Sequence, residues 1–464
     1  MSSRLYRWLA LFFLIGLSLV FLYPDGDQQD AGYHFLFARW AWSEPAYFIS
    51  VWSRPLFTLL YSLPAQVGYP TTKIFTLLIS LATAWQTFCI ARDLGIARAE
   101  LAVPLLLLQP AFFLLFSGTL TEPLFALLFV AALRLDYHQK KSAAACVVSL
   151  LILVRPEGFF VCVVWAARLL FGGDGNESWL VRVRSVAILG IGIASWWLCT
   201  LVVSGDPLWL VHNWPSDWQP FSQTRTGGPF WWYVAILPLI VGPFFLPQFV
   251  RGLIDIFRAR VLVAGLYSFL AIYLVHAIMY VRGWFGDAGY PRYLVCVAPI
   301  TALATLSGWN RFAQLQRRVV TGVVLTAAFL VCLFYVDGYL FTRDSRAVDE
   351  VAATLPPGAM GFQRLVFSQS YMCIRLGCEP PHWLPMTSER ARNLELLRSS
   401  PPETMVFWDS DVGPKWYGLS AEDFAGLGFR KVLSRSFVLD GRFFSLPWKR
   451  HGGLRLQEMH VFYK

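Results

Sequence analysis

Long apolar stretches follow one another from the N-terminus to about residue 341, and a segment of mixed polarity comes after them. An apolar stretch of about 20 residues is long enough to cross the hydrocarbon core of a bilayer as a helix. The pattern predicts an α-helical polytopic membrane protein with about eleven transmembrane helices. The expected spans are residues 8–23, 74–90, 101–116, 120–135, 143–154, 159–170, 185–203, 230–250, 261–281, 293–309 and 319–340.

Two parts of this pattern allow more than one interpretation. Residues 142–171 hold two short apolar stretches, which form either two short spans or a re-entrant hairpin with Arg155-Pro156-Glu157-Gly158 at its tip. Residues 47–67 are apolar enough to cross, but Arg54-Pro55 and Pro64 interrupt a helix there. We expect residues 47–67 to lie along the outer surface, because a crossing would place every later cluster of positive charge outside.

The distribution of positive charge predicts the orientation. Of the 23 Lys and Arg residues before Phe341, 16 fall on the side of the N-terminus and 7 on the other side. Cytoplasmic loops carry the excess of Lys and Arg, so the N-terminus is expected in the cytoplasm. The predicted location is a cell inner or plasma membrane, with the C-terminal segment outside the cytoplasm. The formal charge of +10 lies in short loops and not in a basic stripe, which argues against nucleic-acid binding.

Charged residues make up only 15% of the chain, and their deficit is confined to its first part. We therefore divide the chain into a transmembrane domain at 1–341, with a first outer loop at 24–73, and an extracytoplasmic soluble α/β domain at 342–464. Cys373 and Cys378 lie in this outer domain, where an oxidising environment favours a disulfide. The elements expected in the outer domain are a helix at 346–355, a strand at 404–408, a Ser-capped helix from 420 and strands near 431–433 and 458–462.

Carboxylates gather in the first outer loop, directly after the first span. Asp25, Asp27 and Asp30 are followed by Tyr33 and His34. These carboxylates form a solvated turn, a general base or a cation site. Asp25 and Asp27 are the residues that would ligate a divalent ion such as Mg or Mn, although no cofactor is certain.

Arginines and further carboxylates occur at the outer ends of several spans. The arginines are candidates for binding a phosphate group, and their alternative role is anchoring in the membrane interface. These arginines are Arg54, Arg155, Arg282 and Arg292. Supporting side chains at the same boundary are Glu122, Glu157 and Tyr293. Charge in an apolar context is costly and usually functional, so this boundary is the predicted site.

Four short motifs in this order resemble the GT-C glycosyltransferases, the multi-span class that uses polyprenyl-phosphate sugars. Members include protein O-mannosyltransferases and aminoarabinose transferases. The motifs are Asp30-Ala-Gly-Tyr33, similar to the family's Asp-Glu-x-x-Tyr, then Thr121-Glu122-Pro123-Leu-Phe, Leu153-Val-Arg155-Pro156-Glu157-Gly158 and Pro291-Arg292-Tyr293-Leu-Val. Ala31 stands where many relatives have Glu, which makes Asp27 a candidate second carboxylate.

The resemblance implies a glycosyltransferase that moves a sugar, such as mannose or another hexose, from a polyprenyl-phosphate donor to an acceptor hydroxyl on the outer face. Asp30 would be the catalytic base of an inverting reaction, and the boundary arginines would stabilise the departing phosphate. The acceptor would be a lipid, a glycan or a protein, with membrane lipids around the chain. The alternatives are a secondary transporter or lipid flippase, or a non-catalytic membrane scaffold. No internal repeat of the kind found in transporters is evident.

Overall fold

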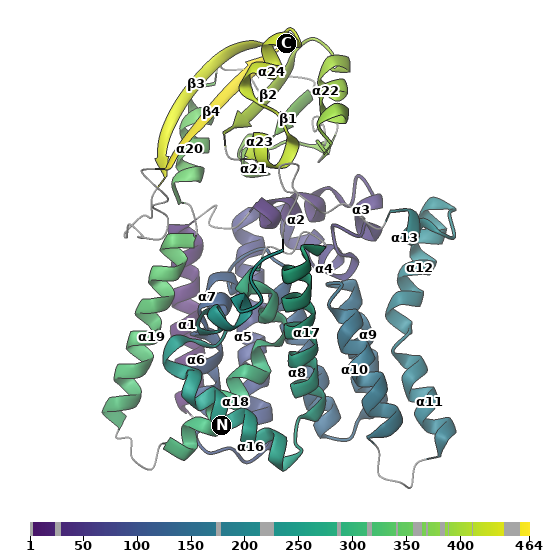
Figure 1. The fold of residues 1–464 in the computed structure, drawn as a ribbon, viewed down its shortest axis with the longest axis vertical. Helices are drawn as coiled ribbons and strands as arrows, with labels where there is room; N and C mark the ends of the chain where they lie inside the picture. Colours follow the sequence, from purple (N-terminus) through teal and green to yellow (C-terminus); the bar gives the residue numbers. More distant parts are fainter. Residues whose placement is uncertain are drawn as a thin grey trace.

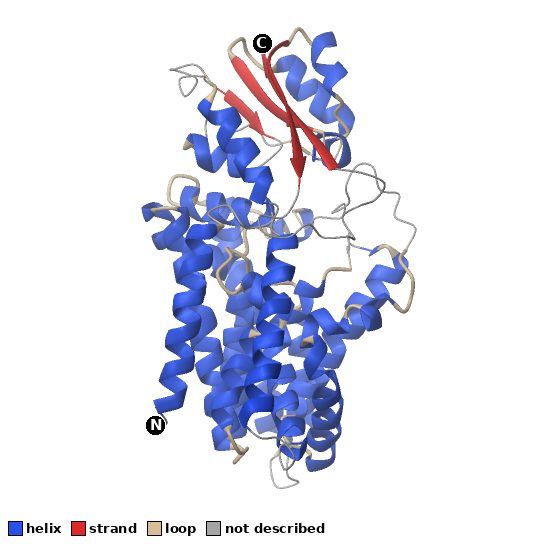
Figure 2. Cartoon of the chain, turned by 90° about the vertical axis from the view of Figure 1, so that its left-hand side faces the viewer, coloured by secondary structure: helices blue, strands red, loops and turns tan. Residues whose placement is uncertain are grey.

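The computed structural model describes residues 3–23, 29–172, 178–213, 227–284, 289–312, 318–339, 342–355, 364–367, 370–380, 386–387, 389–410, 412–439 and 455–464. These residues form a tall bundle of helices with a small sheet at one end (Figure 1). The N-terminus lies at the end of the bundle away from the sheet, and the C-terminus lies in the sheet. Helices lie on both sides of the sheet (Figure 2).

Five of the described helical segments are long and apolar enough to cross a membrane, or six if one bent pair counts as a single span. The bent pair is α11 (Trp179–Ile188) and α12 (Ile191–Ser204), which meet at 44°. The five are α1 (Ser3–Leu22), α5 (Tyr69–Asp93), α17 (Val263–Arg282), the 3₁₀ helix η5 (Pro291–Val297) continued by α18 (Ala298–Phe312), and α19 (Arg318–Tyr339). The membrane class predicted from the sequence is supported, but a count of eleven spans is not.

The remaining apolar stretches are shorter or broken. Residues 99–115 divide into η1 (Ala99–Leu101), α6 (Ala102–Leu107) and α7 (Pro110–Leu115). The break occurs at Gln109, which is extended because the ring of Pro110 disfavours helical backbone in the preceding residue. Residues 232–259 divide into α14 (Trp232–Ala235), α15 (Leu237–Val241), η3 (Pro243–Phe245) and α16 (Leu246–Ala259), with Gly242 at φ 105° before Pro243.

The middle of the bundle contains α8 (Glu122–Tyr137), α9 (Lys141–Ser149), η2 (Leu150–Leu153) and α10 (Gly158–Phe171). The chain turns between η2 and α10, so the stretch at 142–171 consists of two short helices that pack against each other. Gly158 is required at this turn, since a Cβ there would lie 2.4 Å from the backbone nitrogen of Ile152. The turn is therefore tight, and the residues before Gly158 have fixed positions.

Several short helices lie at the end of the bundle that faces the sheet (Figure 1). They are α2 (Gln29–Trp40), α3 (Ala46–Ile49), α4 (Pro55–Val67) and α13 (Trp209–His212). The segment at 47–67 contributes α4, which is 13 residues long and begins with Pro55. Helix α2 packs against α4 on the bundle side and against a helix of the C-terminal part on the other.

The C-terminal part contains a four-stranded mixed sheet in the order β1-β2-β4-β3. Strands β1 and β2 are parallel, while β4 is antiparallel to both β2 and β3. The strands are β1 (Arg364–Phe367), β2 (Thr404–Asp409), β3 (Arg430–Leu439) and β4 (Arg455–Tyr463). The helices are α20 (Thr342–Ala353), α21 (Ser370–Leu376), α22 (Arg390–Ser399), α23 (Val412–Tyr417) and α24 (Ala421–Gly426). Every residue of β2 is buried, and Ser420 begins α24 with the expected capping box.

Candidate active site

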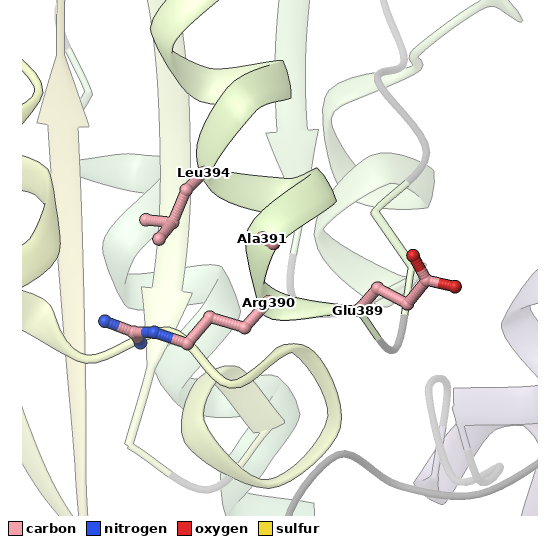
Figure 3. Close-up of a pocket in the computed structure, with 4 residues that line it drawn as sticks. All are labelled: Glu389, Arg390, Ala391 and Leu394. Atoms are coloured by element: carbon pink, nitrogen blue, oxygen red, sulfur yellow. The ribbon is translucent and has the colours of Figure 1, made fainter.

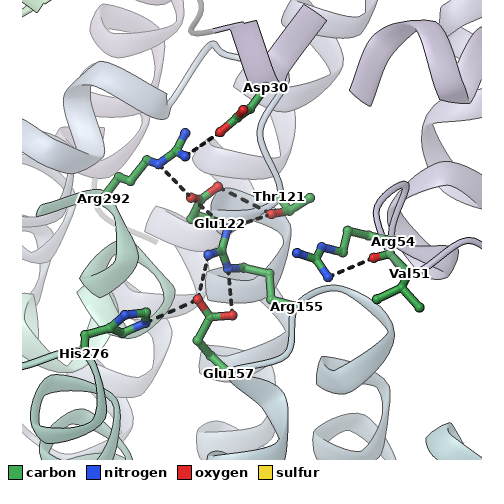
Figure 4. Close-up of polar contacts among 9 residues, drawn as sticks. All are labelled: Asp30, Val51, Arg54, Thr121, Glu122, Arg155, Glu157, His276 and Arg292. Carbon is green, nitrogen blue, oxygen red and sulfur yellow. Dashed lines mark hydrogen bonds and ion pairs between the residues drawn. The ribbon is translucent and has the colours of Figure 1, made fainter. Parts of the chain in front are cut away.

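The site begins with an ion pair between Asp30 and Arg292. Asp30 lies in the first turn of α2, and Arg292 lies in η5 near the start of a membrane-spanning segment. The Nη2 atom of Arg292 donates to Oδ2 of Asp30 at 2.6 Å (Figure 4). The side chain of Asp30 is 35% exposed and that of Arg292 only 10%, so the carboxylate forms the accessible end of the pair.

Glu122, at the start of α8, joins Arg292 to a second arginine. Its side chain is fully buried, and its Oε1 atom lies 2.8 Å from Nη1 of Arg155 and 3.8 Å from Nε of Arg292. A buried carboxylate is stable only when cations or hydrogen bonds compensate for the lost hydration. Glu122 therefore works as a bridge between two guanidinium groups, beyond the helix-terminus role that its position alone suggests.

Arg155 and Glu157 form a two-point pair at the turn before α10. Nη2 of Arg155 donates to Oε1 of Glu157 at 2.6 Å, and Nε donates to Oε2 at 3.1 Å. The Nη1 atom of Arg155 also donates to the Thr121 hydroxyl at 3.0 Å. Such parallel bonds fix the plane of a guanidinium as well as its position.

His276 extends the group from α17. Its Nε2 atom lies 3.3 Å from Oε1 of Glu157, and its ring stacks on Tyr293 with the centroids 4.4 Å apart. His276 was not among the site residues predicted from the sequence. The available signal was a single ionisable residue inside an apolar helix, which by default suggests a functional position.

Together these residues form a continuous line of alternating acidic and basic side chains, which we call the charge chain. Its members come from α2, η5, α8, the turn before α10, and α17, and these elements meet because η5 packs against α8 and α17 while α10 packs against α17. In order, the members are Asp30, Arg292, Glu122, Arg155, Glu157 and His276 (Figure 4). Each of the four members inside the line has a side chain of opposite charge type on both sides, which a single isolated pair cannot provide.

The ionisation of Asp30 follows from its neighbours. Burial raises the pKa of the Asp30 carboxyl, but the adjacent Arg292 outweighs burial, and the pKa lies below its ordinary value of 3.8. Asp30 is therefore a carboxylate at neutral pH. His34 lies one helical turn further along α2, and burial followed by the nearby Arg54 lowers its pKa to about 3. His34 is accordingly neutral, with its ring near Trp52 and Phe57.

Arg54 approaches the charge chain from the opposite side. It precedes α4 with φ 66°, is buried, and donates from Nη1 to the carbonyl of Val51 at 2.8 Å. Figure 4 shows its guanidinium directed towards Arg155. Burial, followed by repulsion from Arg155, lowers the pKa of Arg54 to about 10. The group stays positively charged at neutral pH, in a position where a further negative charge would be stabilised.

The structure brings most of the predicted site residues together, with some exceptions. Arg282 lies at the exposed end of α17, with its guanidinium 5.9 Å from the centroid of Trp284 and no contact with the charge chain among the described residues. Asp25 and Asp27 fall outside the described residues. Within the described part of the chain, no group of three or more His, Cys, Asp or Glu side chains is arranged to hold a metal ion.

Three other predicted residues lie in the C-terminal part or contact it. The hydroxyl of Tyr33 lies 3.1 Å from that of Tyr417. Cys373 and Cys378 are both buried, their thiols are hydrogen-bonding neighbours, and burial raises the pKa of the Cys373 thiol. The structure holds both as free thiols, so the disulfide stays a prediction.

Lys73 is another buried charge that the sequence analysis used only for topology. It lies in the second turn of α5, is 3% exposed, and donates from Nζ to the carbonyl of Tyr23 at 2.6 Å. Its Nζ atom lies 5.7 Å from the centroid of the Tyr69 ring, at the start of α5. The signal that could have identified Lys73 is again a charge at the beginning of an apolar stretch.

A surface hollow in the outer domain is the other candidate location. It lies at the start of α22 and is lined by Glu389, Arg390, Ala391 and Leu394 (Figure 3). The guanidinium of Arg390 is already paired with Asp423, at 2.6 and 2.8 Å. The hollow therefore offers a structural ion pair, whereas the charge chain offers an accessible base and several arginines.

Comparison with solved structures identifies proteins with the same fold. The crystal structure of ArnT from Cupriavidus metallidurans bound to undecaprenyl phosphate has a TM-score of 0.61 at 13% identity, covering 99% of this chain and 98% of ArnT. The apo structure of the same protein has a TM-score of 0.59 at 14% identity, with 99% and 98% covered. No family model matches the sequence, and no curated protein matches it. The chain therefore shares the fold of ArnT over nearly its whole length, and the low identity leaves the activity to be argued from the site.

Proposed function

We propose that this chain is a membrane glycosyltransferase that takes a sugar from a polyprenyl-phosphate donor and passes it to an acceptor hydroxyl. The observation that carries the proposal is the charge chain, which ends in the half-buried carboxylate of Asp30 at the membrane boundary. The fold supports the donor class, because the ArnT structure with this fold was solved with undecaprenyl phosphate bound. The proposed sugar is a hexose such as mannose, and the proposed acceptor is a lipid, glycan or protein of the cell envelope.

Asp30 is the residue that we assign as the base. Its Oδ2 atom accepts a hydrogen bond from Arg292, and its side chain is 35% exposed, which gives an acceptor access to the carboxylate. The acceptor oxygen attacks the anomeric carbon while the bond from that carbon to the donor phosphate breaks. The phosphate leaves with the bonding electron pair, and the acceptor proton passes to Asp30. Attack opposite to the leaving group inverts the anomeric centre.

The arginines are assigned to the donor phosphate. Arg54 and Arg155 repel each other across the site, and an anion between them would relieve that repulsion. Guanidinium groups match the geometry of phosphate oxygens, and Arg292 lies close enough to the base to act on the same leaving group. The charge that develops on the phosphate during bond breaking is stabilised by donors that are already in place.

A divalent metal ion is a separate proposal from the assignment of the base and the arginines. Asp25 and Asp27 are the residues that would hold Mg or Mn, and Asp27 is the proposed second carboxylate in place of the family's Glu. Neither lies among the described residues. The three arginines at the site supply positive charge for the leaving phosphate from the chain itself.

We also propose the orientation that the distribution of positive charge predicts, with the N-terminus in the cytoplasm. Helix α2, which carries Asp30, and the sheet then lie on the outer side, because both are at the end of the bundle opposite to the N-terminus. The donor's lipid tail would stay in the bilayer while its sugar meets the acceptor outside.

The test is chemical conversion by the purified chain in lipid nanodiscs. Radiolabelled polyprenyl-phosphate hexoses are supplied with a membrane extract as the source of acceptor, and free polyprenyl phosphate is measured. Release of polyprenyl phosphate with transfer of the label is the expected result. A transporter or flippase would leave the donor chemically unchanged in every case, which would overturn the proposal.

A further inference from the structure

The outer domain is in direct contact with α2, the helix that carries Asp30. Helix α2 packs against α21, and Tyr417 at the end of α23 reaches the same helix. From this geometry we propose that the outer domain is a latch that holds α2 in its catalytic position, with Tyr417 as a positioning residue and Gly32 as the point where α2 meets α21. This inference rests on the proposed function, since it assigns the positioned group, Asp30, the role of base.

The first contact of the latch is a pair of phenols. The Tyr33 and Tyr417 hydroxyls lie 3.1 Å apart, and Tyr33 is three residues after Asp30, on the neighbouring part of the same helical face. Burial raises the pKa of both Tyr33 and Tyr417, so the hydrogen bond joins two neutral phenols. A hydrogen bond between neutral buried groups does not depend on pH in the physiological range.

The second contact is a close approach of the Gly32 backbone to the side chain of Ser370, the first residue of α21. A Cβ on Gly32 would lie 2.2 Å from Oγ and 2.9 Å from Cβ of Ser370. Cβ atoms in proteins essentially never come within 3.0 Å of an atom to which they are not bonded. The helix can therefore dock at this distance only because position 32 is a glycine, which otherwise costs helical stability.

The third contact lies at the other end of α2. The indole Nε1 of Trp40 donates to the carbonyl of Cys378 at 3.1 Å, and Arg39 pairs with Glu379 at 3.1 Å. The indole bond is buried and contributes to docking. The ion pair is partly exposed, with side chains 35% and 45% accessible to solvent, and contributes less. The three contacts span the helix from residue 32 to residue 40, so they restrain its tilt and its rotation together.

The position of α2 should affect the rate of the chemical step more than it affects the affinity for the donor. The proposed phosphate ligands belong to the segment before α4, the turn before α10 and η5, and none belongs to the outer domain. Asp30 is the group whose place depends on α2. A misplacement of about 1 Å in a catalytic group costs about 100-fold in rate. Loosening the latch should therefore lower kcat and leave the KM for the donor nearly unchanged.

The main experiment uses the full chain in nanodiscs and a pair of substitutions at the close approach. Gly32→Ala should raise hydrogen exchange in residues 29–40 and lower kcat by about tenfold or more, since a Cβ forces the two helices apart. Adding Ser370→Gly removes the clashing atoms, so the double variant should recover both the exchange protection and kcat. Ser370→Gly alone is the matched control for the loss of the serine.

Tyr417→Phe tests the phenol pair without a change of volume. It should lower kcat a few-fold, in line with the loss of one neutral hydrogen bond, and leave the donor KM unchanged.

Two results for Gly32→Ala would overturn the latch. One is unchanged hydrogen exchange in α2, and the other is increased exchange in α2 with unchanged kcat. Hydrogen exchange reports docking even if no transfer is found, so failure of the latch and failure of the proposed activity give different results.

Discussion

Arg292 and Asp30 are 262 positions apart in sequence, and their side chains are joined by a 2.6 Å ion pair. The pair connects the start of a segment long and apolar enough to cross a membrane to the short helix α2 at the end of the bundle that faces the sheet. It has two consequences for chemistry. It keeps Asp30 ionised, and it places a guanidinium beside the group that would take the acceptor proton.

Removing Arg292 should change the pH dependence of transfer. Arg292 lowers the pKa of Asp30, so in Arg292→Gln the pKa rises because burial remains and the compensating cation is lost. The reaction needs ionised Asp30, so the acidic limb of the pH profile of kcat should move to higher pH. The measurement is that profile for both proteins. An acidic limb at the same pH in both would show that Asp30 is not the group that titrates.

Arg155 should dominate the stability of the charge chain. Arg155→Ala leaves the buried carboxylates of Glu122 and Glu157 without their main cation, which should cost about 3–5 kcal/mol of unfolding free energy. Thermal unfolding in one detergent measures the loss. The matched control is Arg92→Ala, which breaks an ion pair whose arginine is exposed and should cost less than about 1 kcal/mol. Equal effects of the two substitutions would mean that burial of the charge chain does not matter.

Substitutions of Arg54 and Arg282 test which predicted arginines bind the donor phosphate. Both were predicted to bind the donor phosphate, but only Arg54 faces the charge chain. Arg54→Gln should raise the donor KM by about tenfold or more, as expected for loss of a charge-assisted contact, with a smaller change in kcat. Arg282→Gln should leave the donor KM unchanged. A large effect at Arg282 with none at Arg54 would move the phosphate site to the end of α17.

Thiol labelling tests the orientation. In a variant without native cysteines, Glu44→Cys lies at the sheet end of the bundle and Arg258→Cys lies near the end of α16, and both positions are exposed. A membrane-impermeant maleimide added to intact cells should label position 44 and not position 258. Labelling of position 258 alone would place the N-terminus outside.

Several residues of the candidate site could be predicted from the sequence, because each lies at the end of an apolar stretch. Four of these residues lie at the ends of apolar stretches, on the same predicted side of the membrane: Asp30, Glu122, Arg155 and Arg292. The positions of the apolar stretches and the distribution of Lys and Arg between the two sides predict that they share one boundary. The elements of the sheet were predictable for a similar reason, since capping at Ser420 and the apolar run of β2 are local signals.

The pairings within the site were not predictable. No local pattern specifies that Arg292 meets Asp30 or that His276 meets Glu157, because packing of η5 and α17 decides both. The latch contacts between α2 and the outer domain are equally non-local. The count of eleven spans stays a prediction, because apolar composition does not reveal where a helix breaks, as it does at Gln109 before Pro110.

The most direct test of the central claim is sugar transfer by Asp30→Asn. The amide keeps the size of the carboxylate and cannot accept the acceptor proton as a base, so transfer should fall by at least about 100-fold. Expression, membrane insertion and thermal stabilisation by added polyprenyl phosphate should stay close to those of the unmodified chain. A fully active Asp30→Asn protein would contradict the assignment of Asp30 as the base and the mechanism built on it.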